Sequence, residues 1–227
     1  MAILHLETWE MYVVIITTGL SNLCMLPTVL RVLKRHPPCF GSIGVFGLIV
    51  SMCYHVAEAL PDQQLFGLDE GQWHRLDNIA SIGSFNAVFV YMCDIQDSHM
   101  RELLQLFQVS VVVVLQTHAP WDLRFTFFPL LFHLGLFLCK RFIAEKFFFQ
   151  QSIHQKGWNR YSVKMALLWL IPALFCFVKG LDDQHDYLRI WHGLWHAFIG
   201  ISCYYQCDML QNVPLDYVTH KHSSLEV

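Results

Sequence analysis

The sequence predicts an all-α protein, a bundle of seven membrane-spanning helices with its N-terminus outside or luminal and its C-terminus cytosolic. Three observations predict it. Of the 227 residues, 55% are hydrophobic and only 15% are charged, a composition typical of a chain dissolved in lipid. The apolar residues gather in stretches of roughly 20, the length that crosses a bilayer core. Lysine and arginine fall mostly on one side of those stretches.

Seven apolar stretches follow one another along the chain, separated by short polar or proline-marked breaks. We expect spans near residues 11–33, 41–60, 77–96, 103–119, 122–143, 163–180 and 188–208. The breaks run over residues 31–38, 61–75, 97–102, 118–122, 145–160 and 180–186. Together the spans consume most of the chain. We therefore expect a single multi-pass membrane domain over residues 1–227, ending in a short cytosolic tail at 209–227.

Three of the predicted spans, the first, third and fourth, have features that bear on the number of spans. The first follows Glu7 and Glu10 and precedes a basic segment, the reverse of a cleavable signal peptide, so we expect it to remain in the mature protein. The third opens with a charged residue. The fourth is short and contains the glutamines Gln105, Gln108 and Gln116, so a bundle of six spans is the alternative.

Basic residues predict the orientation. Ten of them fall in alternate loops on one side: Arg31, Lys34, Arg35, Arg101, Lys140, Arg141, Lys146, Lys156, Arg160 and Lys164. The other side receives four, Arg75, Arg124, Lys179 and Arg189, and the tail adds Lys221 to the richer side. The richer side is therefore expected to be cytosolic.

The composition also excludes several classes of protein. A net charge of −3 without a basic region leaves nothing to bind a phosphate backbone, which excludes a nucleic-acid partner. The eight cysteines form no CxxC pair and lie mostly in apolar stretches, which argues against a disulfide framework or a zinc finger. Cys203 and Cys207 fit core packing, with palmitoylation as the alternative.

Four ionisable residues are expected at one depth near the outer ends of their spans. His192 and His196 are four residues apart, so both imidazoles lie on one helical face. The predicted orientation brings His55 of the second span and Asp77 of the third to the same level. Ionisable side chains inside a membrane are expensive and are functional candidates by default. Interhelical hydrogen bonding is the simpler explanation of the His192–His196 pair, and His133 is expected to be a hydrogen-bonded interior residue.

Three converging imidazoles with an open fourth position form the ligand set of a catalytic zinc. We expect His55, His192 and His196 to hold Zn²⁺. Asp77 would accept a hydrogen bond from an imidazole N–H or a bound water and act as general base. Ser51, one turn deeper than His55, would donate a hydrogen bond to a developing oxyanion or to the backbone. Asp77, Ser81 and Ser84 make one polar stripe.

These residues resemble the signature of the CREST superfamily of seven-span membrane proteins, and within it the transmembrane protein 8 and myomaker family. The resemblance is carried by Ser21–Pro27, Ser51-x3-His55, Asp77-x3-Ser81-x2-Ser84, Asp186-Tyr187 and His192-x3-His196. It implies a zinc held by the three histidines and, for the enzymes of the superfamily, hydrolysis of amide or ester bonds of lipids. Glu58 departs from the pattern, and the cysteine-rich tail of myomaker is missing.

The sequence thus favours a zinc-dependent membrane hydrolase that cleaves an amide or ester bond of a ceramide-like, GPI-like or phospholipid-like molecule at the outer or luminal leaflet. Its partner is a membrane lipid, and its location is the plasma membrane or the endoplasmic reticulum and Golgi. The alternative is a non-enzymatic receptor or membrane-fusion protein with a structural metal site. A haem-bearing electron carrier is a third class, which the clustering of histidines at one leaflet disfavours. Phe125, Phe127, Phe128 and Phe132 would line an acyl-chain pocket or simply face lipid.

Overall fold

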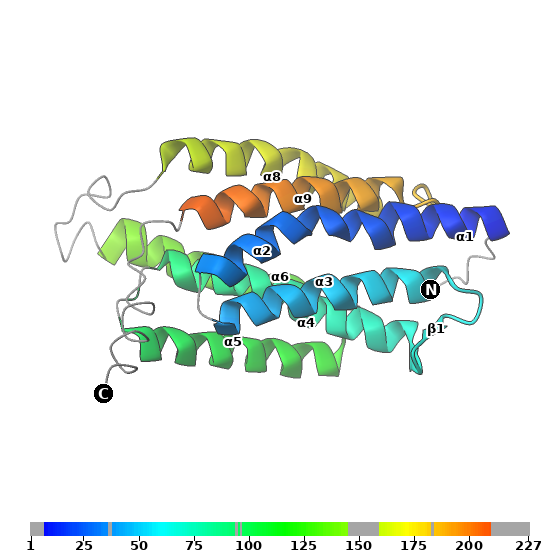
Figure 1. Ribbon diagram of the computed structural model, residues 1–227. Helices are drawn as coiled ribbons and strands as arrows, with labels where there is room; N and C mark the ends of the chain where they lie inside the picture. Colours follow the sequence, from blue (N-terminus) through cyan, green and yellow to red (C-terminus); the bar gives the residue numbers. More distant parts are fainter. Residues whose placement is uncertain are drawn as a thin grey trace, which may run out of the picture.

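The computed structural model describes residues 7–35, 38–93, 95, 97–144, 159–182 and 184–209. Within them the chain forms long helices that run along one common direction (Figure 1). The helical segments are α1 (Thr8–Val14), η1 (Ile15–Gly19), η2 (Leu20–Met25), α2 (Leu26–Arg35), α3 (Pro38–Ala59), α4 (Glu70–Met92), α5 (Ser98–His118), α6 (Leu123–Leu138), η3 (Cys139–Ala144), α8 (Arg160–Gly180) and α9 (Ile190–Met209). Each of the seven predicted stretches is occupied by one of these helices or by a run of them, so the helical class is confirmed.

Three of the described helical runs are long and apolar enough to cross a membrane: Thr8–Lys34, Phe40–Ala59 and Arg160–Gly180. The helix Leu123–Leu138 is apolar but shorter. Large apolar side chains cover the outer faces of these helices, as Leu167, Ile171 and Phe175 do on α8. Such a surface is unfavourable in water and suits a lipid environment.

The first helical run is broken in its middle, where η1 is a π-helix and η2 a 3-10 helix. Two threonines stabilise the break, because the Thr17 hydroxyl donates to the Val13 carbonyl and the Thr18 hydroxyl to the Val14 carbonyl. A π-turn inside a helix is rare and is often found at functional sites. Here the break leaves the Thr18 carbonyl to accept side-chain hydrogen bonds, among them one from the Asn22 amide.

Helix α9 packs closely on this broken run through two glycines on one face. A Cβ atom on Gly193 would overlap the Thr17 carbonyl oxygen, and one on Gly200 would lie 2.8 Å from the Cys24 carbonyl oxygen. The two glycines are seven residues apart on α9, and Thr17 and Cys24 are seven residues apart on the first run, so the two backbones stay in contact over two turns. Small residues that allow such an approach are common at helix interfaces in membranes.

The glutamines of α5 face α4 rather than lipid. Gln105 and Gln108 are almost fully buried, and their amides donate to the carbonyl oxygens of Ala87 and Gly83 on α4. Gln116 donates to the Phe125 carbonyl. These bonds give the N–H groups of the three amides internal partners, as polar groups in an apolar medium need. The Oε1 atoms of Gln105 and Gln108 have no partner among the described residues.

A short hairpin connects α3 to α4. Its strands β1 (Gln64–Leu65) and β2 (Leu68–Asp69) pair antiparallel through a two-residue turn. Both turn residues have positive φ, 52° at Phe66 and 80° at Gly67, as the twist of a tight hairpin requires. Phe66 is 84% exposed at the tip. Asp69 then caps α4 by accepting from the Gln72 N–H.

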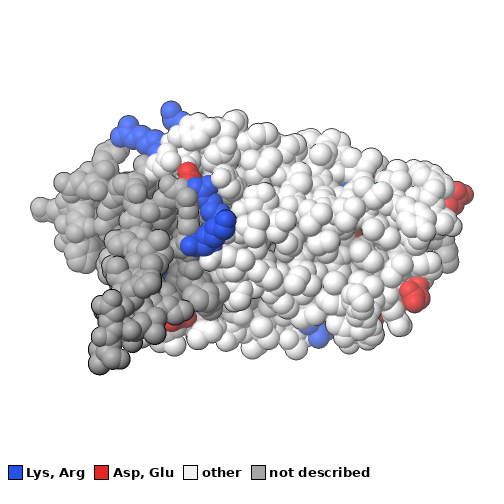
Figure 2. Space-filling model, in the orientation of Figure 1, with Lys and Arg blue, Asp and Glu red and all other residues white. Residues whose placement is uncertain are grey.

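The two ends of the bundle differ in charge. On the face shown in Figure 2, most lysine and arginine side chains gather toward the end where α2 ends and α8 begins, whereas acidic side chains are visible at both ends. At the basic end Asp208 of α9 pairs with Arg31 and accepts from the Ser162 hydroxyl, which joins three helices. Lys146, Lys156 and residues 210–227, which include Lys221 and nearly all of the predicted tail, lie outside the described residues.

We predict that Gly193→Ala lowers the thermal stability of the purified protein. The added methyl would overlap the Thr17 carbonyl, so α9 must move away from η1, and overpacking of this kind costs about 1–3 kcal/mol. Thermal unfolding in detergent measures the effect. Gly135→Ala in α6 is the matched control, because nothing lies within 4 Å of its added methyl and alanine favours a helix. Equal melting temperatures for the two variants would contradict the contact.

Candidate metal centre

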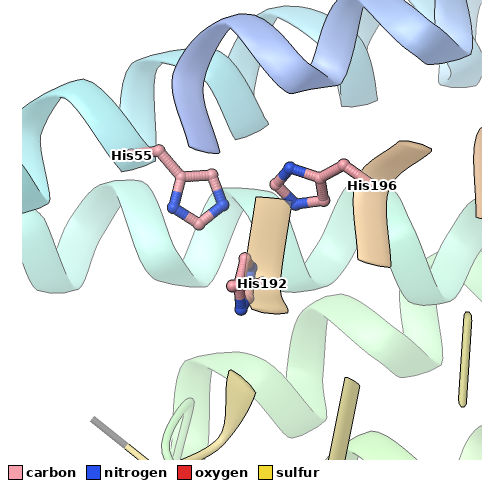
Figure 3. Close-up of side chains that lie close together, drawn as sticks. All are labelled: His55, His192 and His196. Carbon is pink, nitrogen blue, oxygen red and sulfur yellow. The ribbon is translucent and has the colours of Figure 1, made fainter. Parts of the chain in front are cut away.

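The structure brings the three predicted histidine ligands together at one end of the bundle. His55 lies one turn before the end of α3, and His192 and His196 lie in the first two turns of α9 (Figure 3). The ring centroid of His55 lies 4.8 Å from that of His192 and 4.9 Å from that of His196, and the centroids of the two α9 rings are 4.9 Å apart. Helices far apart in sequence therefore present three imidazoles to one point.

This cluster could hold a metal ion. One nitrogen from each ring lies within 4.8 Å of the other two, and the side chains of His55 and His196 are buried. Metal–nitrogen bonds near 2 Å in a tetrahedral arrangement place ligand nitrogens about 3.3 Å apart. Side-chain rotations that move these nitrogens by on the order of 1 Å would bring all three to bonding distance of one ion. Imidazole nitrogens suit several transition metals, zinc among them, and three of them leave a fourth position open.

His55 is held in one tautomer by a carboxylate. Its Nδ1 lies 3.0 Å from Oε2 of Glu58, three residues later on α3. An ionised carboxylate only accepts hydrogen bonds, so Nδ1 carries the hydrogen and Nε2 carries a lone pair. That Nε2 is buried and has no hydrogen-bond partner among the described residues. A buried nitrogen with an unused lone pair is what a metal ligand requires.

His196 is held by the broken first run. Its Nδ1 lies 2.9 Å from the Ser21 hydroxyl and 3.2 Å from the Thr18 carbonyl oxygen. The Ser21 hydroxyl itself donates to that carbonyl, so it accepts from the imidazole. Nδ1 of His196 is therefore a donor, and Nε2 is the nitrogen with the lone pair. The π and 3-10 turns thus supply the partners of the second imidazole.

The start of α9 is held by two residues of the preceding loop. The buried Asp186 carboxylate accepts from the backbone N–H groups of Trp191 and His192, which caps the helix. Arg189, just before the helix, is in the left-handed region with a φ of 57°. Its guanidinium forms an ion pair with Glu58, so the loop is connected to the partner of His55.

The other two predicted site residues lie beside each other on adjacent helices. Ser51 of α3 is buried, and its hydroxyl hydrogen-bonds the Asp77 carboxylate of α4. Ser81, one turn further along α4, donates to the same carboxylate at 3.4 Å. Asp77 of α4 and Ser51 of α3 therefore form one polar pair, with Ser51 four residues before His55 on the same helix. The orienting role toward an imidazole that we expected of Asp77 is performed for His55 by Glu58.

Residues outside the cluster follow the simpler expectations. His133 bonds through Nδ1 to the Pro129 carbonyl at 2.8 Å within α6, as an interior histidine would. Cys207 is buried with Ala87 and Tyr91, which agrees with core packing.

Three contributors were not recognised as site residues from the sequence. Glu58 stood out only as a departure from a pattern, although its spacing of three from His55 puts both on one helical face. Arg189 was counted as a loop charge, but it is buried. Ser21 was only part of the resemblance. Its contact with His196 spans 175 positions, and no local pattern reports such a distance.

We predict that Asp186→Ala destabilises the protein by about 1–2 kcal/mol, because the N–H groups of Trp191 and His192 lose their acceptor. Asp186→Asn keeps one acceptor oxygen for one of the two N–H groups and should retain part of the stability. Thermal unfolding, combined with amide hydrogen exchange at residues 191 and 192, measures both effects. Indistinguishable Ala and Asn variants would argue against capping.

Comparison with known proteins gives one finding. A search of the curated proteins finds no match. A family model described as "Protein of unknown function (DUF3522)" matches residues 10–197. The matched region contains the three histidines, Asp77, Ser51, Glu58 and Arg189. The chain therefore belongs to the DUF3522 family.

Proposed function

We propose that this protein is a zinc-dependent membrane hydrolase that cleaves an amide or ester bond of a lipid at the outer or luminal leaflet. One observation carries the proposal: three histidines from two helices converge, and Nε2 of the buried His55 has no hydrogen-bond partner among the described residues. In the CREST superfamily, which the sequence resembles, such a set accompanies hydrolysis of ceramide-like, GPI-like or phospholipid-like molecules.

The proposal includes seven spans with an outer N-terminus, in the plasma membrane or in the endoplasmic reticulum and Golgi. The asymmetry of basic residues supports this orientation. Exposed aromatic side chains at the histidine end support a membrane interface at that end, since tryptophan and tyrosine are enriched at both interfaces. They are Trp9, Phe66, Trp121, Tyr187 and Trp191. A site at this level would meet the headgroup region, where the amide and ester bonds of lipids lie.

His55, His192 and His196 would hold the zinc, which when bound supplies a water acidified to a pKa of about 7 and polarises a carbonyl. Hydrolysis adds the oxygen of one water to the carbonyl carbon, and the C–N or C–O bond breaks. The water proton must reach the leaving nitrogen or oxygen. Asp77 is the carboxylate for this transfer, and the Ser51 and Ser81 hydroxyls orient it.

A second function is supported by the helices that the cluster joins. His55 on α3 meets two histidines of α9, and His196 also bonds to the first run. A metal at this point would staple three parts of the bundle. A receptor or membrane-fusion protein with a structural metal site would use the same residues. Turnover distinguishes the two functions.

We predict about one zinc per chain in the purified protein, and its loss in His192→Ala and His196→Ala. Each substitution removes one of three ligands, which leaves too few for tight binding. Elemental analysis after dialysis against a weak chelator measures the metal. His133→Ala, which removes a histidine bonded within α6, is the matched control and should keep its zinc. Zinc retained by both α9 variants would exclude this site.

We predict that Asp77→Asn reduces lipid hydrolysis at least about 100-fold while zinc content and melting temperature stay near wild type, because only the proton acceptor is lost. Release of fatty acid from ceramide, phospholipid and GPI substrates in mixed micelles measures turnover. Asp62→Asn, in the exposed connection between α3 and β1, is the control. Zinc-loaded wild-type protein without turnover on any of these lipids would favour the scaffold.

A further inference from the structure

Glu58 and Arg189 form an ion pair on the Nδ1 side of His55. Nε2, on the opposite side of the ring, faces His192 and His196 (Figure 3). The Glu58 carboxylate contacts His55 Nδ1 through Oε2 and Arg189 through Oε1, so one carboxylate serves both residues. The side chains of His55, Glu58 and Arg189 are 2%, 10% and 11% exposed. A chain of three polar groups is therefore shielded from solvent between α3 and the start of α9.

A buried carboxylate requires a compensating charge, and the fold provides it from an unusual backbone position. Arg189 adopts the left-handed region, which non-glycine residues rarely occupy unless their surroundings require it. Its N–H donates to the Asp186 carbonyl, and its own carbonyl accepts from the Gly193 N–H. The backbone of the loop is thus fixed at the residue whose guanidinium reaches Glu58.

This arrangement couples the third ligand to the helix that carries the other two. Arg189 immediately precedes α9, and His192 and His196 follow it by three and seven residues. One oxygen of Glu58 therefore binds Arg189, which immediately precedes α9. The other oxygen determines which nitrogen of His55 carries the hydrogen. Carboxylates that bond the far nitrogen of a ligating histidine orient the ring and make it a stronger ligand.

We propose that Glu58 and Arg189 are positioning residues for the metal centre: Glu58 holds His55 with Nε2 toward the cluster, and Arg189 holds Glu58 and the start of α9 in register with it. The inference rests on the proposed metal site and adds two residues to it. Glu58 bonds the nitrogen of His55 that points away from the cluster, so it acts on the ring and not on the metal position.

The test replaces the buried pair by apolar residues of similar length, Glu58→Met/Arg189→Met. Such replacements generally preserve folding, because no uncompensated charge remains. The first readout is independent of metal and of turnover. Nitrogen NMR of histidine-labelled, metal-free protein in detergent reports the tautomer of His55. We expect the Nδ1–H tautomer in the wild type and its loss in the double variant.

The second readout is zinc affinity, measured by competition with a chromophoric chelator. We expect a 10- to 100-fold weaker Kd in the double variant. Glu58→Gln/Arg189→Met, which keeps an acceptor oxygen for Nδ1, should recover most of the tautomer and part of the affinity. The matched control is Asp182→Met. Asp182 bonds Nδ1 of His185 at 2.7 Å with the same spacing of three, but in an exposed loop, so its removal should change neither readout.

An unchanged His55 tautomer in the double variant would overturn the inference, as would an unchanged zinc affinity in a wild type that binds zinc. Failure of the proposed function is recognised separately. If wild-type protein binds zinc but hydrolyses no lipid, the hydrolase is wrong, while the affinity and tautomer results still decide the roles of Glu58 and Arg189. If wild-type protein binds no zinc, the metal site is wrong, and the tautomer result alone decides whether Glu58 positions His55.

Discussion

The close contact between α9 and the broken first run is the constraint on which the site depends. Because Gly193 has no side chain, the backbone of α9 reaches the carbonyl of Thr17. His192 and His196 flank this contact on the same helix, so its position determines where their rings lie. The π and 3-10 turns opposite provide the Ser21 hydroxyl and the Thr18 carbonyl that His196 needs. Packing and hydrogen bonding are therefore satisfied at the same place.

Polar side chains in the bundle illustrate a second rule, that a group removed from water must find its partner inside the protein. Gln105 and Gln108 of α5 donate to carbonyl oxygens of α4, and Asp208 joins three helices at the basic end. Nε2 of His55 is one of several buried side-chain atoms without a partner in the described part of the chain, and the Oε1 atoms of Gln105 and Gln108 are others. It differs from those other atoms because it lies where two further imidazoles converge.

Two layers of residues can be distinguished around the cluster. The imidazoles form the inner layer, and Glu58, Ser21 and Asp186 fix them through a ring nitrogen or through the helix backbone. Asp77 and Ser51 form a separate polar pair on neighbouring helices. In the proposed hydrolase the first group would hold the metal and Asp77 would transfer the proton, whereas a purely structural site would need only the first group.

The sequence by itself determined the helical class, the order of the helices and the three histidines, because apolar length and helical spacing are local properties that residues carry wherever the chain folds. The tertiary structure alone decided which hydrogen bonds orient those histidines. Glu58 meets Arg189 across 131 positions, and Ser21 meets His196 across 175. The break at η1 and the left-handed backbone at Arg189 also escaped the sequence. Such features arise when helices distant along the chain compete for the same space, and no local pattern encodes that competition.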